Sequence, residues 1–236
     1  DLLFYCKKWM ICLTHINTII MKSLFAFIII ITLISCGDNG PNCPGDILLP
    51  INISPNKLFY NLGDTITISS KFHKLLYDQK TDKYYDASNY KFRPSISFLA
   101  LDISDEKNVL SQVNEYCDFI KLDSSKMNVF YPGIESAIVG DYTLSKDSLG
   151  FVIKLKLKKS GYFWLKIESL TSGDSHLQNN YQFNCRGRYI DFDLVAPKES
   201  GIYLLHKFRF IQSNDWILSD SIHRFYNHAG YCFEVR

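Results

Sequence analysis

The stretch FVIKLKLKKSGYFWLKIES, residues 151–169, decides the fold class of this chain. Apolar side chains occupy every second position from Phe151 to Leu157, and the alternation resumes after a turn at residues 159–161. Because successive side chains of a strand point to opposite faces of a sheet, this period of two is typical of strands with one buried face. The short glycine-containing turn between the two runs predicts a β-hairpin.

Similar alternation recurs along the chain and indicates about eight strands. The further predicted strands include Asp64–Phe72, Ser95–Ile103, Tyr189–Val195, Ile202–Ile211 and Tyr231–Val235. The strand at Ser95–Ile103 is apolar on both faces, which predicts a central position in its sheet. Only Asp105–Cys117 carries a helical pattern.

Many strands at short spacing, without alternating helices, are typical of antiparallel sheets. The sequence therefore predicts an all-β fold, an antiparallel β-sandwich of immunoglobulin-like type with one long loop insertion and at most one short helix. A β-barrel is the main alternative.

Composition excludes several classes of protein. The chain has 26 basic and 24 acidic residues and is 47% hydrophobic, so it is neither a disordered tail nor a strongly charged nucleic-acid binder. Basic and acidic side chains are equal in number over residues 36–236. Such a balance provides no long-range field, and we expect no nucleic-acid partner.

Residues 21–36 read MKSLFAFIIIITLISC and have the order of a secretory signal peptide. Lys22 provides a short basic region, and an apolar stretch runs from Leu24 to Ile34. That stretch is much shorter than the roughly 20 residues that a membrane-spanning helix needs. The pattern therefore indicates export rather than a permanent transmembrane helix.

The last four residues of this segment, Leu33-Ile34-Ser35-Cys36, resemble the lipobox of bacterial lipoproteins. The resemblance implies cleavage before Cys36, acylation of its thiol with chains such as palmitate, and anchoring in a lipid bilayer. The implied location is the bacterial cell envelope, and we expect the outer membrane, on its periplasmic or surface side. In pattern alone, the remainder resembles uncharacterised β-rich envelope lipoproteins of Gram-negative bacteria.

These assignments divide the chain into four parts. Residues 1–20 are interpreted as upstream translation rather than native protein, and residues 21–35 as the lipoprotein signal peptide. Residues 36–50 hold the lipidated cysteine and a tether rich in glycine and proline. Residues 51–236 are predicted to form a single β-sandwich domain.

Four further cysteines, Cys43, Cys117, Cys185 and Cys232, follow the lipobox. Disulfides are permitted in an oxidising compartment, and four cysteines allow three pairings. Four buried free thiols are the alternative. No two of the four have the Cys-x-x-Cys spacing of common zinc and redox sites.

Two aspartates are the best candidates for acid–base chemistry. Asp191 and Asp193 fall on one face of a predicted strand, about 7 Å apart, a separation that some glycosidase carboxylate pairs share. We favour a structural interpretation, in which both lie on the outer face and pair across strands with lysines such as Lys154 and Lys156.

The late histidines have no spacing that suits a metal site. His223 and His228 are five residues apart, and His206 alternates in phase with apolar neighbours, which predicts a position at the edge of the core. Known hydrolase and phosphate-loop motifs are also missing from the sequence. We therefore predict no catalytic residues, no metal and no cofactor.

The segment Asp78–Pro94 is polar but carries Tyr84, Tyr85 and Tyr90. A long loop with amphipathic rings is typical of binding surfaces, so these tyrosines are the predicted ligand contacts. The alternative is that the rings cover the edge of a sheet. Tyr162 and Trp164 lie on the outward face of the predicted hairpin, and we expect a second layer to bury them.

Three function classes remain after this survey. A non-enzymatic envelope protein with a structural or protein-binding role requires only the anchor, the tether and a neutral β domain. A glycan-binding module would need the tyrosine segment exposed, and a hydrolase would need a site that known motifs do not describe. We favour the first class, with an envelope protein or glycan as the partner.

Overall fold

The computed structural model describes residues 47–88, 90, 92–103, 113–122, 126–131, 136–169, 190–194 and 200–236. The signal peptide, Cys36, the start of the tether, Cys43 and Cys185 lie outside these residues. Among the described residues, no helix has the length and apolar character needed to cross a membrane.

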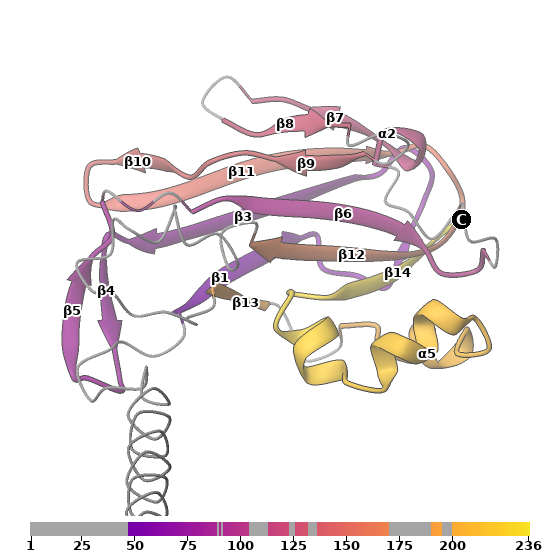
Figure 1. The fold of residues 1–236 in the computed structure, drawn as a ribbon. Coiled ribbons are helices and arrows are strands. Elements are labelled where there is room, and N and C mark those ends of the chain that lie inside the picture. Colours follow the sequence, from indigo (N-terminus) through magenta and orange to yellow (C-terminus); the bar gives the residue numbers. More distant parts are fainter. Residues whose placement is uncertain are drawn as a thin grey trace, which may run out of the picture. The chain divides into compact units, whose positions relative to one another are not determined.

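The first sheet contains six strands and is mixed rather than purely antiparallel (Figure 1). Its order is β10 (Thr143–Ser145), β11 (Ser148–Leu157), β3 (Thr65–His73), β1 (Ile47–Ser54) and β13 (Ile190–Leu194), and β7 (Cys117–Ile120) also pairs with β11. The pairing of β1 with β13 is parallel, and the other pairings are antiparallel.

The second sheet also contains six strands. Its order is β2 (Phe59–Tyr60), β14 (Tyr231–Val235), β12 (Gly161–Ser169), β6 (Pro94–Ala100), β9 (Ala137–Val139) and β8 (Asn128–Phe130). The pairing of β2 with β14 is parallel. β6 lies inside the sheet, as its two apolar faces predicted.

The core forms where the inner faces of the two sheets meet. From β11, alternate side chains such as Phe151 and Leu155 are buried, and Phe163 on β12 faces them from the other sheet. Aromatic rings fill the centre, with Phe98 lying 5.0 Å from Phe163 and 5.6 Å from Phe233 between ring centroids. This arrangement confirms the predicted β-sandwich.

The predicted hairpin at residues 151–169 is wrong. β11 pairs with β3, β7 and β10, whereas β12 pairs with β6 and β14, so the chain crosses from one sheet to the other between Leu157 and Gly161. Gly161 has φ 144°, a conformation that favours glycine. Both a hairpin and a crossing need one buried face on each strand, so alternation cannot tell them apart.

The strand predicted at Ile202–Ile211 is also wrong. This segment holds α4 (Tyr203–Lys207), followed by α5 (Gln212–Leu218) and the π-helix η2 (Ile222–Tyr226). With α2 (Val113–Tyr116), the described residues thus contain more than one short helix. α2 lies within the predicted helix, but the last residue of that prediction, Cys117, begins β7.

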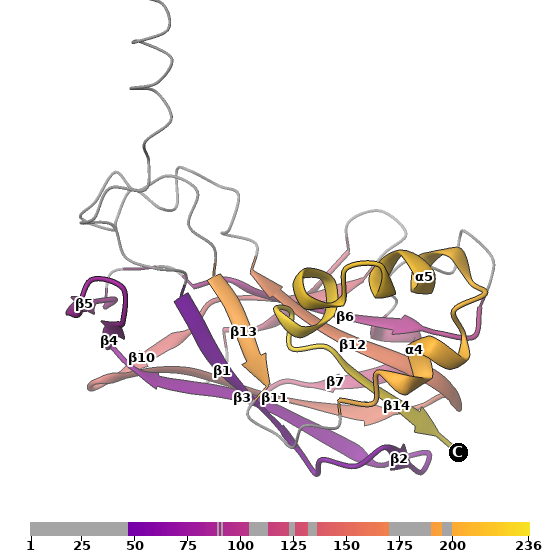
Figure 2. The same cartoon turned by 90° about the horizontal axis from the view of Figure 1, so that it is seen from below.

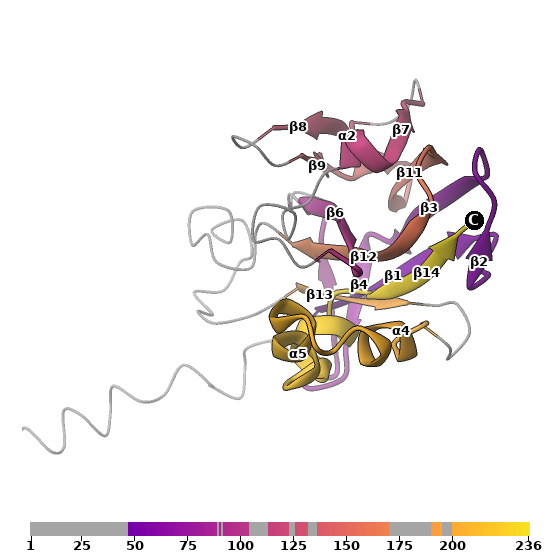
Figure 3. The ribbon, with the colours of Figure 1, turned by 90° about the vertical axis from the view of Figure 1, so that its right-hand side faces the viewer.

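The C-terminal helices cover the outer face of the second sheet. Figures 1, 2 and 3 show them beside β12 and β14, on the side away from β11. Their inner side chains join strand residues in a second apolar cluster, made of Leu101, Trp164, Leu204, Leu205, Ile217, Phe225 and Cys232. Within the part of the chain that the structure describes, these helices therefore form a third layer over the second sheet.

Candidate functional site

The polar segment expected to be a long loop contains a β-hairpin. β4 (Leu75–Asp78) pairs with β5 (Lys83–Asp86) in a two-stranded sheet of its own, separate from both sandwich sheets (Figure 1). Its turn is closed by Asp78, whose carboxylate accepts a 2.8 Å hydrogen bond from the Thr81 amide. Asp82 adopts the left-handed conformation, φ 54°, that such turns require and that Asp tolerates.

Two tyrosines lie directly opposite each other on this hairpin and are exposed to solvent. Tyr77 and Tyr84 are register partners, and their ring centroids lie 5.1 Å apart. Tyr77 is 51% exposed and Tyr84 is 70% exposed. The Tyr77 hydroxyl donates a 2.7 Å hydrogen bond to Asp82, which raises the pKa of Tyr77 and fixes its ring.

The three tyrosines predicted as ligand contacts do not share one surface. Tyr85 is buried, and its hydroxyl lies 2.8 Å from the Thr81 hydroxyl. Tyr90 is buried in the main core, with its ring 4.4 Å from that of Phe92. Only Tyr84 is exposed, and its neighbour in space is Tyr77. Tyr77 lies just before the predicted binding segment, Asp78–Pro94. Its register with Tyr84 identifies it as a contact candidate.

The predicted aspartate pair lies on β13. The Asp193 side chain is exposed, and the side chain of Asp191 falls outside the described residues. The strand next to β13 is β1, not β11, so cross-strand pairing with Lys154 and Lys156 is wrong. The parallel β1–β13 pairing, which the sequence pattern does not reveal, accounts for this difference.

The three histidines are separated in the fold. His206 is exposed on α4, not at the edge of the core, because the segment is a helix and its phase changes. His223 pairs with Asp220 at 2.9 Å, and partial burial lowers the pKa of His228. Within the described ranges, no group of three or more His, Cys, Asp or Glu side chains could hold a metal ion.

Cys117 and Cys232 are buried free thiols. The Cys117 thiol donates to the Val113 carbonyl oxygen at 3.1 Å, and burial raises its pKa to about 12. Cys232 belongs to the apolar cluster beneath the C-terminal helices, and burial also raises its pKa. Neither thiol has the lowered pKa that a nucleophile needs. A pairing of Cys43 with Cys185 lies outside the described residues.

Of the two aromatic residues on the outward face of β12, Trp164 is buried, as expected, and Tyr162 is only partly buried. Trp164 is 5% exposed and stacks on Phe225 of the helical layer. Tyr162 lies 4.8 Å from the Phe208 ring, and the Lys207 ammonium sits 4.2 Å from its ring centroid. These rings are structural, so they do not extend the exposed tyrosine pair.

No protein-family model matches the sequence, and neither does any curated protein. Among solved structures, the human F-spondin reeler domain is similar over 57% of this chain and 84% of its own length, with 11% identity and a TM-score of 0.33. A type II cohesin domain from the cellulosome of Acetivibrio cellulolyticus is similar over 54% of this chain and 78% of its own length, with 13% identity and a TM-score of 0.26. The fold assignment rests on the strand pairing and the core described above.

Proposed function

We propose that this chain is a lipid-anchored protein of the bacterial cell envelope with a non-enzymatic, protein-binding role, and that Tyr77 and Tyr84 are its main contact residues. One observation carries the binding role. Two tyrosine rings in contact are exposed on a hairpin that belongs to neither sandwich sheet. The envelope location rests on the lipobox resemblance around Cys36.

The tyrosine pair has the properties of an interface anchor. A tyrosine ring offers a large amphipathic area and loses little conformational entropy on binding. The ring contact with Tyr84 and the hydrogen bond to Asp82 already restrict Tyr77 before any partner arrives. This preorganisation lowers the entropic cost of association.

Charges of both signs surround the rings. Lys80, Asp82 and Lys83 are exposed on the turn and on the start of β5. A mixed polar rim around aromatic anchors is the usual anatomy of a protein interface. A neutral glycan would need the rings and relatively few of the charges, so a glycan-binding role is the second candidate function.

Site-specific crosslinking tests the binding role. Benzoylphenylalanine is placed at position 77, 84 or 131 of the full chain in the native host, and adducts are separated after irradiation. Tyr131 is the matched control because it is 57% exposed and lies beside β8, outside the hairpin. We expect one protein adduct that forms from positions 77 and 84 and not from 131.

The identified adduct protein is then titrated with purified variants. Tyr84→Ala should weaken its binding by about 1 kcal/mol or more, roughly fivefold, as expected for a hot-spot ring. Tyr131→Ala should leave binding unchanged. Equal adducts from all three positions would exclude the hairpin as the contact. Retention of the wild-type protein but not of Tyr84→Ala on envelope glycan, without any protein adduct, would favour the second candidate.

The anchor is tested separately with labelled palmitate. The wild-type chain should incorporate the label, and a Cys36→Ala variant should not. Equal incorporation by both chains would refute the lipid anchor and leave the hairpin proposal untouched.

A further inference from the structure

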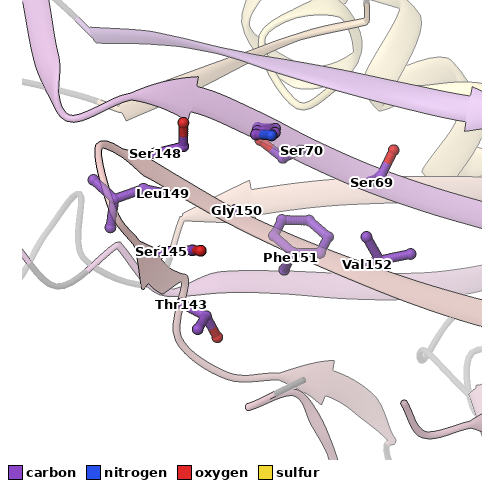
Figure 4. A pocket seen from close by; sticks show the side chains of 10 residues that line it. Ser69, Ser70, Thr143, Ser145, Ser148, Leu149, Gly150, Phe151 and Val152 are labelled. Atoms are coloured by element: carbon purple, nitrogen blue, oxygen red, sulfur yellow. The ribbon is translucent and has the colours of Figure 1, made fainter. Parts of the chain in front are cut away.

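A groove lies along β10, β11 and β3 (Figure 4). The C-terminal helices lie on the other side of the second sheet from these strands (Figure 1). It is open to solvent and has a volume of about 440 Å³. Hydroxyl and ammonium groups dominate the polar part of its lining, which includes Ser69, Lys71, Thr143, Ser145 and Ser148. Val152 contributes an exposed apolar edge.

A glycine keeps the centre of the groove empty. Gly150 lies between Lys71 on β3 and Thr143 on β10 in the strand register. A Cβ atom at this position would lie 2.8 Å from the Ser70 carbonyl oxygen, so the adjacent strand leaves no room for a side chain. The groove is therefore a built-in hollow of the sheet surface, bounded by polar side chains on both sides.

Four polar groups of the groove are available to a ligand. Among the described residues, the hydroxyls of Ser69, Ser145 and Ser148 have no hydrogen-bond partner, and Lys71 has no ion-pair partner. The described residues that line the groove include no carboxylate. These groups can all donate hydrogen bonds, and no neighbouring negative charge in the lining would repel an anion.

Positive charge continues from the groove along β11. Lys154 and Lys156 are exposed on the same face as Gly150, and neither has an ion-pair partner among the described residues. By contrast, Lys158 at the end of this row pairs with Asp118 at 3.1 Å. From Gly150 to Lys156 the strand rises about 20 Å, so the cations form an extended row rather than a compact cluster.

We propose that this groove and lysine row, defined by Ser69, Lys71, Ser145, Ser148, Lys154 and Lys156, bind an acidic polysaccharide. Hydroxyl donors suit the many oxygen atoms of a sugar chain, and the lysines suit its carboxylate or phosphate groups. The open, elongated shape fits a chain rather than a small enclosed molecule. Among the described lining residues, the one aromatic ring, that of Phe151, is buried, whereas single-stranded nucleic acid needs exposed rings for base stacking.

Affinity electrophoresis of the full chain in detergent micelles tests this proposal. Native gels contain polygalacturonate as the acidic probe or dextran as the neutral one. Polygalacturonate should retard the wild-type protein, dextran should not, and added salt should weaken the retardation because the contacts are exposed charges.

The decisive comparison uses two variants with the same change in net charge. Lys71→Gln/Lys154→Gln should weaken the affinity for polygalacturonate at least about fivefold. Lys126→Gln/Lys207→Gln, which removes two exposed lysines that lie outside both the groove and the hairpin, should keep the wild-type affinity. Ser145→Ala/Ser148→Ala should cause a smaller loss at unchanged charge. Circular dichroism confirms that each variant is folded.

Three results would overturn the proposal. In a parallel gel, oligo-dT replaces polygalacturonate. Binding of oligo-dT that is tighter than binding of polygalacturonate would assign the lysine row to nucleic acid. An equal loss in both lysine pairs would mean that binding reflects net charge and not this groove. An absence of retardation of the wild-type protein by polygalacturonate would reject an acidic polysaccharide as the ligand.

Discussion

The two outer faces of the sandwich differ in what lies on them. Over β12 and β14, the C-terminal helices cover Trp164, which is 5% exposed. Over β3 and β11, Val152 is 41% exposed, and Lys154 and Lys156 follow it at the next outward positions of β11. The core-facing sides of β11 and β12 follow the same alternation. Only the outward residues therefore indicate which sheet is covered by a further layer. A large aromatic ring at an outward position indicates a further layer, whereas lysine indicates solvent.

The largest effect on stability is expected on the outer face of β12 and β14, which the C-terminal helices cover. Trp164→Ala should lower the free energy of unfolding by about 3–5 kcal/mol, because it opens a cavity between β12 and the helical layer. Guanidinium unfolding, followed by far-ultraviolet circular dichroism, measures this change.

Trp164→Phe is the control for that prediction. It keeps an aromatic ring against Phe225 and removes an indole N–H that has no hydrogen-bond partner among the described residues. We therefore expect a clearly smaller loss than for Ala. Equal losses in the two variants would show that the indole makes a contact that packing with Phe225 does not explain.

An intermediate effect is expected on the core side of β3, beneath the exposed outer face of the first sheet. The Tyr142 hydroxyl donates a 2.7 Å hydrogen bond to the hydroxyl of Ser70, and both residues are buried. Tyr142→Phe should lower the free energy of unfolding by about 1 kcal/mol, because the Ser70 hydroxyl then loses its donor.

A double-mutant cycle with Ser70→Ala checks this interpretation. If the hydrogen bond is responsible, the double variant should be more stable than the sum of the two single losses predicts. Strict additivity of the two losses would contradict the coupling.

The smallest effect is expected on the exposed outer face of β3 and β11. Val152→Ser should change the free energy of unfolding by no more than about 0.5 kcal/mol, because the side chain is already 41% exposed. The same unfolding experiment measures it. A loss of 2 kcal/mol or more would mean that another part of the molecule covers this face, and the two faces would then be alike.

Alternation predicts which side chains are buried better than it predicts pairing. The inward positions of β11 and the central place of β6 follow from the sequence. The partners of β11 and β12 do not, because a hairpin and a crossing bury the same side chains. Two parallel pairings, β1 with β13 and β2 with β14, join segments whose sequence spacing carries no signal.

The segment 202–211 shows where a period of two misleads. Ile202, Leu204 and Phe208 fit a strand, but Leu205 is buried as well, and Leu204 with Leu205 forms the inner side of α4. Packing against Trp164 selects the helix, and this contact is invisible to a local pattern. The exposure of His206 follows directly from this change of phase.

The candidate site was predicted only in part. The sequence identifies a tyrosine-rich segment and includes Tyr84, but it cannot separate Tyr84 from Tyr90. Tyr90 is buried against Phe92, whose ring packs on Phe72 and Tyr142 from other parts of the chain. Tyr77 becomes a candidate only through its register with Tyr84. The groove at Gly150 depends on three strands, and no short motif describes it.

The parallel pairing of β1 with β13 has a consequence for folding kinetics. Leu49 finds its register partner at Phe192, near the other end of the domain, so the pairing has very high contact order. During synthesis or translocation, β1 emerges long before the strand that completes its sheet. Sheets dominated by such distant pairings fold in milliseconds to seconds rather than microseconds. Because the chain also passes between sheets after β11, we expect neither sheet to form first as an independent unit, and the nascent domain should depend on protection from aggregation until its last strands arrive.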